Sequence, residues 1–192
     1  MDSIILTLLI FLPVLGAVIM LPAARMYGKD NPNIFKWIAL AVTGIQLLLA
    51  IMLYVGFDPS LSISASPYTV QVDWIKHFNI QYFVGVDGLS MPMVLLTALL
   101  SFLSIGISWN ITKQPLGYFS LFLLLDAGMM GVFLSLDFFL FYVFWEVMLL
   151  PMYFLIGMWG GPKRHYAAIK FFLFTLFGSV FMLLGMLALY FY

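Results

Sequence analysis

The sequence has no cysteine, only two histidines and few charged residues of either sign. Without cysteine, disulfides, thiol chemistry and cysteine-ligated clusters are excluded within this chain. His77 and His165 are not in a metal-ligand spacing, so the sequence offers no candidate metal site. Eight basic residues balance eight acidic ones, and this zero net charge gives no indication of nucleic-acid binding.

Hydrophobic residues dominate the composition of the sequence. They make up 65% of the 192 positions, against 8% charged residues, and the mean hydropathy is +1.12. Soluble domains carry about 25% charged residues, so this composition indicates a chain surrounded mostly by lipid. The first 25 residues do not resemble a cleaved signal peptide, because their start carries Asp2 without a basic residue and their apolar run is too long.

The apolar residues form six segments long enough to cross a bilayer, which takes about 20 residues each. The sequence therefore predicts an all-α polytopic membrane protein with six transmembrane helices. Their expected ranges are Ser3 to Leu21, Ile34 to Val55, Leu89 to Trp109, Gly117 to Ser135, Asp137 to Trp159 and Tyr166 to Tyr190.

Only the connection over residues 56–88, between the second and third helices, is long. Apolar and polar residues alternate around Tyr68 to Val72 and again around Ile80 to Val84. This period is typical of β-structure, so we expect a short extended segment or hairpin outside the bilayer. We expect the chain to divide into two parts: residues 1–116 with the first three helices and the external hairpin segment, and residues 117–192 with the last three helices.

The basic residues predict the orientation. With the N-terminus outside, Lys76 is the one basic residue in an outward connection, and six others lie at inward-facing ends: Arg25, Lys29, Lys36, Lys113, Lys163 and Arg164. An excess of Lys and Arg marks the cytoplasmic side. We therefore expect the hairpin segment and both ends of the chain on the outer, periplasmic side of an energy-transducing membrane such as the bacterial inner membrane.

Glu146 is the strongest candidate for a functional residue. It lies about nine residues into the fifth helix, about 13 Å from its outer end and about 20 Å from its inner end. Burial favours the neutral acid and a nearby cation favours the carboxylate, so a carboxyl between these two effects can exchange protons. Tyr142 and Tyr153 share its helical face and could hydrogen-bond it or hold water. The alternative is a protonated side chain that only joins neighbouring helices.

Pro151 follows Glu146 on the same helix and deprives the Val147 carbonyl of its helical donor. The resulting kink could bind a water on a proton path or could serve packing alone.

Three further charged residues are auxiliary candidates. Asp126 is central in the fourth helix, where it could be a second functional carboxyl or an interhelical hydrogen-bond partner, and Gly128 and Gly131 allow close helix packing there. Lys170 lies about 6 Å into the sixth helix, too shallow to pair directly with Glu146, and its side chain could extend to the membrane surface. Asp137 begins the fifth helix, where capping is the expected role.

Two stretches of the sequence are specific enough for comparison with known families. The first, from Val84 to Leu100, is VGVDGLSMPMVLLTALL. The second runs from Leu134 to Gly185, and its most specific part is FWEVMLLPMY. Both resemble the M-type antiporter-like membrane subunit of respiratory complex I, the NADH:quinone oxidoreductase. The resemblance extends over the whole chain.

The resemblance implies that these helices are the first part of a fourteen-helix fold containing two inverted repeats, the first of which begins at the fourth helix. It also implies that Glu146 is the glutamate that works with a lysine on a later, broken helix. No redox cofactor is expected in this chain, because its sequence offers no ligand set for one. The resemblance implies FMN, iron–sulfur clusters and quinone in partner subunits, and antiporter-like membrane subunits as neighbours.

The sequence ends at LALYFY without that broken helix. We therefore expect either a piece of a longer subunit or a remainder carried by another chain. Three functions stay open: a proton-translocating subunit of complex I, a subunit of a multisubunit cation/proton antiporter, and a membrane scaffold that transports nothing.

Overall fold

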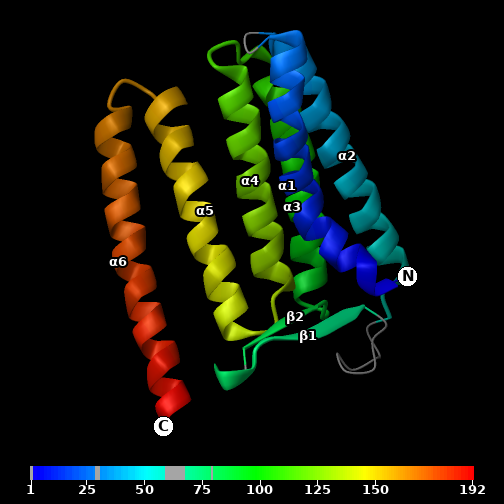
Figure 1. Cartoon of the computed structure of the whole chain (residues 1–192), viewed down its shortest axis with the longest axis vertical. Helices are drawn as coiled ribbons and strands as arrows, with labels where there is room; N and C mark the ends of the chain where they lie inside the picture. The colour runs from blue at the N-terminus through cyan, green and yellow to red at the C-terminus, as the bar shows by residue number, and fades with distance from the viewer. Residues whose placement is uncertain (1, 29–30, 59–67, 79) are drawn as a thin grey trace.

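The computed structural model describes residues 2–28, 31–58, 68–78 and 80–192, and these form a bundle of long helices with a small β-hairpin at one end (Figure 1). Six helices are long and apolar enough to cross a membrane, which confirms the expected number. They are α1 (Asp2–Tyr27), α2 (Pro32–Gly56), α3 (Ser90–Ile107), α4 (Pro115–Leu134), α5 (Phe138–Trp159) and α6 (Arg164–Phe191).

The helix boundaries lie within two residues of the expected ones, except at the end of α1. The sequence predicted an end at Leu21, before a proline, but α1 continues through Pro22 to Tyr27. A proline removes only one backbone donor from a helix, and Ala23 and Ala24, which follow it, are strong helix formers. At the other end of the chain, α6 begins at Arg164, two residues earlier than expected.

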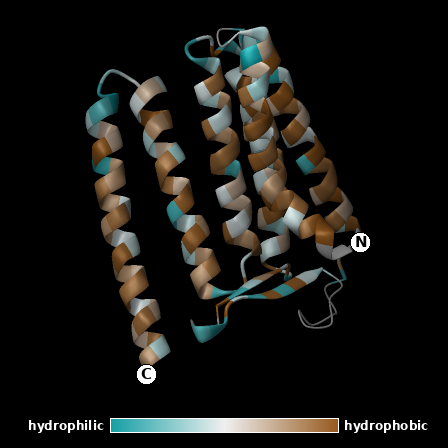
Figure 2. Ribbon diagram, in the orientation of Figure 1, coloured by the Kyte–Doolittle hydropathy of each residue, from teal (hydrophilic) through white to brown (hydrophobic). Residues whose placement is uncertain are grey.

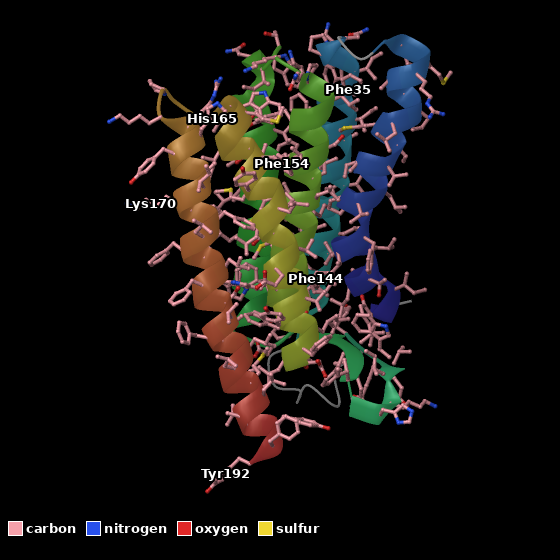
Figure 3. All side chains as sticks on the ribbon, turned by 60° about the vertical axis from the view of Figure 1, so that its left-hand side comes forward. Phe35, Phe144, Phe154, His165, Lys170 and Tyr192 are labelled. Atoms are coloured by element: carbon pink, nitrogen blue, oxygen red, sulfur yellow. The ribbon has the colours of Figure 1, made fainter. Side chains whose placement is uncertain are left out.

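The helices form a block of four with two more at its side (Figure 1). In the block, α4 packs against α1, α2 and α3, while on its other side α4 packs against α5, and α5 packs against α6. One buried apolar cluster lies near the hairpin and includes Leu6 and Leu53, and a second includes Phe35 and Phe119. Phe35 lies near the end of the bundle opposite the hairpin (Figure 3).

Apolar residues cover the outside of the bundle as well as its interior (Figure 2). Exposed side chains on α5 and α6 include Leu150, Phe174 and Phe177. Because hydrocarbon rather than water surrounds a spanning helix, such a surface is the expected one for a membrane protein. Isolated hydrophilic positions interrupt the apolar ribbons of α4 and α5 (Figure 2).

The connection between α2 and α3 contains the expected hairpin. Strands β1 (Thr69–Ile75) and β2 (Ile80–Gly85) pair antiparallel and are joined by a 3₁₀ turn at Lys76–Phe78. The backbone N–H of Leu136, between α4 and α5, donates to the carbonyl of Phe83 at 2.9 Å. The hairpin is therefore fastened to the turn that leads into α5, at the same end of the bundle as both chain termini (Figure 1).

The basic residues follow the expected distribution along the bundle. Lys76 lies on the hairpin, and five others lie at or near helix ends on the opposite side: Arg25, Lys36, Lys113, Lys163 and Arg164. Lys29, which was counted with them, lies outside the described residues.

Candidate functional site

Glu146 is half-buried at mid-depth in α5. It lies eight residues after Phe138 and thirteen before Trp159, or about 12 Å and 20 Å along the helix axis. One of its carboxyl oxygens, Oε1, is fully buried and has no hydrogen-bond partner among the described residues. A buried carboxyl oxygen without a partner is costly in an apolar medium, so Glu146 carries unsatisfied bonding capacity.

Tyr142 and Ser179 are the polar side chains beside this carboxyl. Tyr142 precedes Glu146 by one helical turn, and its hydroxyl interacts with both the Glu146 carboxyl and the Ser179 hydroxyl on α6. Ser179 lies fifteen residues into α6, about 22 Å from its start, and therefore at the depth of Glu146. A hydroxyl can donate and accept, so this trio connects α5 and α6 with groups able to relay a proton.

Sequence reasoning did not identify Ser179. Its signal was a small polar residue in a mostly apolar helix, which is weak because Ser side chains in helices also bond to their own backbone. Ser179 does so here, since its hydroxyl donates to the Leu176 carbonyl at 2.9 Å.

Tyr153 and Pro151 lie farther along α5. The Tyr153 ring packs edge-on against Phe172 of α6, with 5.5 Å between ring centroids. Pro151 is buried inside α5, and the helix continues through it to Trp159. The proline leaves the Val147 carbonyl without its helical donor and does not end the helix.

Lys170 is exposed on α6 and is not brought to Glu146. Its ammonium group lies 5.9 Å from the ring centroid of Tyr166, one turn earlier on the same helix. Lys170 is on the side of α6 that faces away from the other helices (Figure 3). It lies about 9 Å into α6, whereas Glu146 is about 20 Å deep from the same side, so the two residues differ in depth by about 11 Å.

Asp126 is fully buried in the four-helix block and belongs to a different group of side chains. The Ser101 hydroxyl of α3 donates to its Oδ1 at 2.5 Å, and the Gln46 amide of α2 interacts with the same carboxyl. The second oxygen, Oδ2, has no hydrogen-bond partner among the described residues. Sequence reasoning left its partners open and identified neither Ser101 nor Gln46.

The contact between α4 and α5 explains why Asp126 and Glu146 are apart. A Cβ atom on Gly131 would overlap the ring of Phe144, and one on Gly128 would lie 2.5 Å from Cγ of Met148. The two glycines therefore face α5, which confirms the expected close packing. Asp126 is two residues before Gly128, about 200° around the helix, so it points away from α5.

The same contact sets the orientation of α5. Phe144 lies against α4, and Glu146, two residues later, is about 200° around the helix from it. Glu146 therefore points away from α4, on the side where Tyr142 contacts α6. Figure 3 shows Phe144 on the side of α5 that faces away from α6.

Asp137 caps α5, as the sequence predicted. Its Oδ1 accepts from the backbone N–H groups of Phe139 at 2.9 Å and Leu140 at 3.0 Å. Its Oδ2 accepts from the N–H of Gln81 in β2 at 3.3 Å, which adds a link to the hairpin. Asp137 also lines an apolar cavity of about 680 Å³ between the hairpin and the ends of α5 and α6.

Asp87 plays the corresponding part before α3, outside the membrane-spanning segments. Its Oδ1 accepts from the N–H groups of Leu89 at 3.1 Å and Ser90 at 2.6 Å. The hydrogen bond from the Ser90 backbone holds the pKa of the Asp87 carboxyl below its ordinary value, because it stabilises the ionised form.

Lys36 is the basic residue whose environment the sequence did not reveal. Only 5% of its surface is exposed, and its ammonium group lies 5.9 Å from the ring centroid of Trp109. It lies near the start of α2, ten residues before Gln46, which is about 15 Å along the axis.

Within the described ranges, no three His, Cys, Asp or Glu residues gather into a metal-ligating cluster.

Comparisons with known proteins find relatives and solved structures that are similar to this chain. A family model described as NADH:quinone oxidoreductase/Mrp antiporter, TM, matches residues 135–192, which include Glu146. NADH-quinone oxidoreductase subunit M of Rhodobacter capsulatus is 41% identical over 189 residues, which cover 97% of this chain and 36% of that protein. NAD(P)H-quinone oxidoreductase chain 4 2 of Synechococcus sp. strain JA-3-3Ab is 39% identical over 185 residues, covering 95% and 34%.

Among solved structures, a chain of respiratory complex I from Thermus thermophilus with bound NADH superposes with a TM-score of 0.78 at 27% identity. The match covers 95% of this chain and 35% of that one. The present chain thus spans about a third of the length of the relatives it matches. Residues 135–192 thus match the family of membrane subunits shared by NADH:quinone oxidoreductases and Mrp antiporters, and the chain as a whole is similar to the M-type subunits of NADH:quinone oxidoreductases.

Proposed function

We propose that this chain forms part of a proton-translocating membrane subunit of an NADH:quinone oxidoreductase, in which Glu146 takes up and releases the proton. The observation that supports this most is the Glu146 carboxyl itself. It is half-buried at mid-depth in the membrane-spanning bundle, and its Oε1 lacks a partner among the described residues. By contrast, both oxygens of the Asp137 carboxyl, which caps α5, accept hydrogen bonds.

Proton exchange at Glu146 requires two states of similar free energy. The apolar surroundings favour the neutral acid, and a cation that approaches the carboxyl favours its ionised form. Among the described residues, Lys170 is about 11 Å shallower than Glu146 and does not face it. The family resemblance assigns the cation to a lysine on a later, broken helix, and movement of that cation would switch Glu146 between its two states.

Tyr142 and Ser179 are the proposed relay on the α6 side of this carboxyl. A proton arriving at Tyr142 binds its hydroxyl oxygen while the original hydroxyl proton moves to the Glu146 carboxylate, so Tyr142 is neutral before and after the transfer. The interaction of Tyr142 with both neighbours supports this path.

The proposal extends to the partners and the membrane. Redox chemistry, with FMN, iron–sulfur clusters and quinone, belongs to partner subunits, and antiporter-like subunits are the membrane neighbours. The end of the bundle opposite the hairpin carries five of the described basic residues, which supports placing that end in the cytoplasm. The hairpin and both termini of this chain would then lie on the periplasmic side of a bacterial inner membrane.

Glu146→Gln in the complete complex tests the function, because glutamine keeps the shape of the side chain and cannot exchange a proton. Reconstituted vesicles report NADH oxidation and proton uptake in one experiment. We expect pumping to fall, together with redox turnover if the two are tightly coupled. Lys170→Met is the matched control, and both activities should stay at the wild-type level. Wild-type redox activity with an unchanged proton gradient in Glu146→Gln would overturn the proposal.

A cation/proton antiporter subunit is the second candidate, because the matching family model includes the Mrp antiporters. Purification of the native complex separates the two functions. Flavin and iron–sulfur proteins in stoichiometric amounts support the oxidoreductase, whereas their absence together with Na⁺-driven proton exchange supports the antiporter. If Glu146→Gln perturbs assembly and leaves transport intact, the residue belongs to a membrane scaffold.

A further inference from the structure

The buried side chains around Asp126 connect all four helices of the central block. Asp126 and Gln46 are 0% exposed and Ser101 is 2% exposed, so no solvent reaches them. Ser101 on α3 donates to Asp126 on α4, and the Gln46 amide on α2 donates through Nε2 to the Leu9 carbonyl on α1 at 3.2 Å. Burial of this many polar groups in a spanning bundle is costly unless each finds a partner.

Pro13 explains why the Leu9 carbonyl is free to accept. In an α-helix this carbonyl would accept from the N–H group four residues later, and that position holds a proline, which has none. The carbonyl then requires another donor inside the bundle, and Gln46 supplies it. This bond also fixes the orientation of the amide, because a reversed amide would place its oxygen against the carbonyl oxygen.

With Nε2 directed at Leu9, Oε1 of Gln46 needs a donor from elsewhere, and it has none among the described residues. Oδ2 of Asp126 is likewise buried without a partner in the described ranges, and the Gln46 amide lies beside this carboxyl. Both atoms accept hydrogen bonds when Asp126 is ionised. A single proton on Oδ2 turns that oxygen into a donor to Oε1 and satisfies both atoms at once.

Within the described part of the block, no charged group is placed to keep Asp126 ionised. Besides Asp126, the charged residues of α1 to α4 are Asp2 and Arg25 near the ends of α1 and Lys36 near the start of α2, about 15 Å from Gln46. On α5, Glu146 points away from α4, and it is an acid in any case. A buried carboxylate without a cation is strongly disfavoured, so the surroundings select the neutral acid.

We propose that Asp126 holds its proton permanently and, as a neutral acid, donates it to Gln46, closing a hydrogen-bonded junction of α1, α2, α3 and α4. The series runs from Ser101 to Asp126, from Asp126 to Gln46 and from Gln46 to Leu9. Asp126 is in this role a positioning residue, which keeps the block rigid beside α5. The inference does not depend on proton transfer at Glu146.

Infrared spectroscopy tests the proton directly. The full-length subunit in its complex is prepared with ¹³C-labelled aspartate carboxyls, and the spectrum of Asp126→Asn is subtracted from that of the wild type. We expect the difference to contain a protonated-carboxyl C=O band that is unchanged from about pH 5 to about pH 9, well above the ordinary pKa of aspartate. A carboxylate band instead, or a C=O band that titrates in this range, would overturn the proposal.

A second variant covers the case in which Asp126→Asn does not assemble. Gln46→Leu removes the acceptor, so the labelled C=O band should move to higher frequency while Asp126 stays protonated. A band unmoved by Gln46→Leu would refute the bond to Gln46. In Glu146→Gln the Asp126 band should persist whatever happens to pumping, which separates this inference from the proposed function.

The stability of the variants gives an independent readout. In Asp126→Asn the new amide can accept from Ser101 and donate to Gln46, so this variant should unfold near the wild-type temperature, whereas Asp126→Leu should unfold at a clearly lower one. Pro13→Ala returns an N–H donor to the Leu9 carbonyl and should reduce the destabilisation caused by Gln46→Leu. Equal losses in Asp126→Asn and Asp126→Leu would contradict a neutral donor at this position.

Discussion

Gly131→Ala is expected to disturb the packing contact between α4 and α5 and, with it, the position of Glu146. The added methyl group would overlap the ring of Phe144, which is packed against the buried cluster near the hairpin. Relief requires the ring or the whole of α5 to shift, and overpacking of this kind costs about 1–3 kcal/mol. Gly178→Ala on α6 is the matched control, because a Cβ there meets no atom of the described residues within 4 Å.

Thermal unfolding of the purified full-length subunit, together with its yield in the assembled complex, measures this effect. We expect Gly131→Ala to be less stable than Gly178→Ala by at least about 1 kcal/mol, since the control gains helix propensity without a clash. Adding Phe144→Leu should offset part of the loss, giving a coupling energy of about 1 kcal/mol in a double-mutant cycle. Equal stability of the two alanine variants, or purely additive losses in the cycle, would refute the reasoning.

Two further predictions concern the caps at the hairpin end. Asp137→Ala leaves the first N–H groups of α5 without their acceptor and should cost about 1 kcal/mol of unfolding free energy, as measured against Asp73→Ala on the exposed face of the hairpin. An equal loss in both variants would contradict the capping role. Asp87 has a lowered pKa in the folded protein, so the stability it contributes is present above its ordinary pKa and is lost as the pH falls through the folded value. The free energy of unfolding, measured as a function of pH, should therefore fall less steeply below about pH 4 in Asp87→Asn than in the wild type. The same pH profile in both proteins would exclude this contribution of Asp87.

The sequence could predict the six spans and the hairpin because each depends on local pattern. Runs of apolar residues define the helices, and the alternation before and after Lys76 defines β1 and β2. Asp137 could be assigned as a cap because its position at the start of α5 already determines which backbone groups it meets. Gly128 and Gly131 likewise indicated a close helix contact, since small residues serve that purpose in membranes.

The partners of the buried polar residues could not be predicted in the same way. A helix that is apolar on every side gives no stripe to tell which face is inside, so the sequence could not place Asp126 against α2 and α3 rather than α5. Its bonds to Ser101 and Gln46 depend on how four helices are rotated about their axes. Ser179 was missed for the same reason, and Lys36 because a basic residue near a helix end ordinarily marks orientation alone.

The proton on Glu146 is the central claim, and its infrared signal during turnover tests it most directly. In the complete complex with ¹³C-labelled glutamate carboxyls, NADH-driven turnover should produce a protonated-carboxyl band that rises and falls with the redox cycle. The band should be absent in Glu146→Gln and present in Lys170→Met. A labelled complex that pumps at the wild-type rate with no turnover-dependent change assignable to Glu146 would contradict the account.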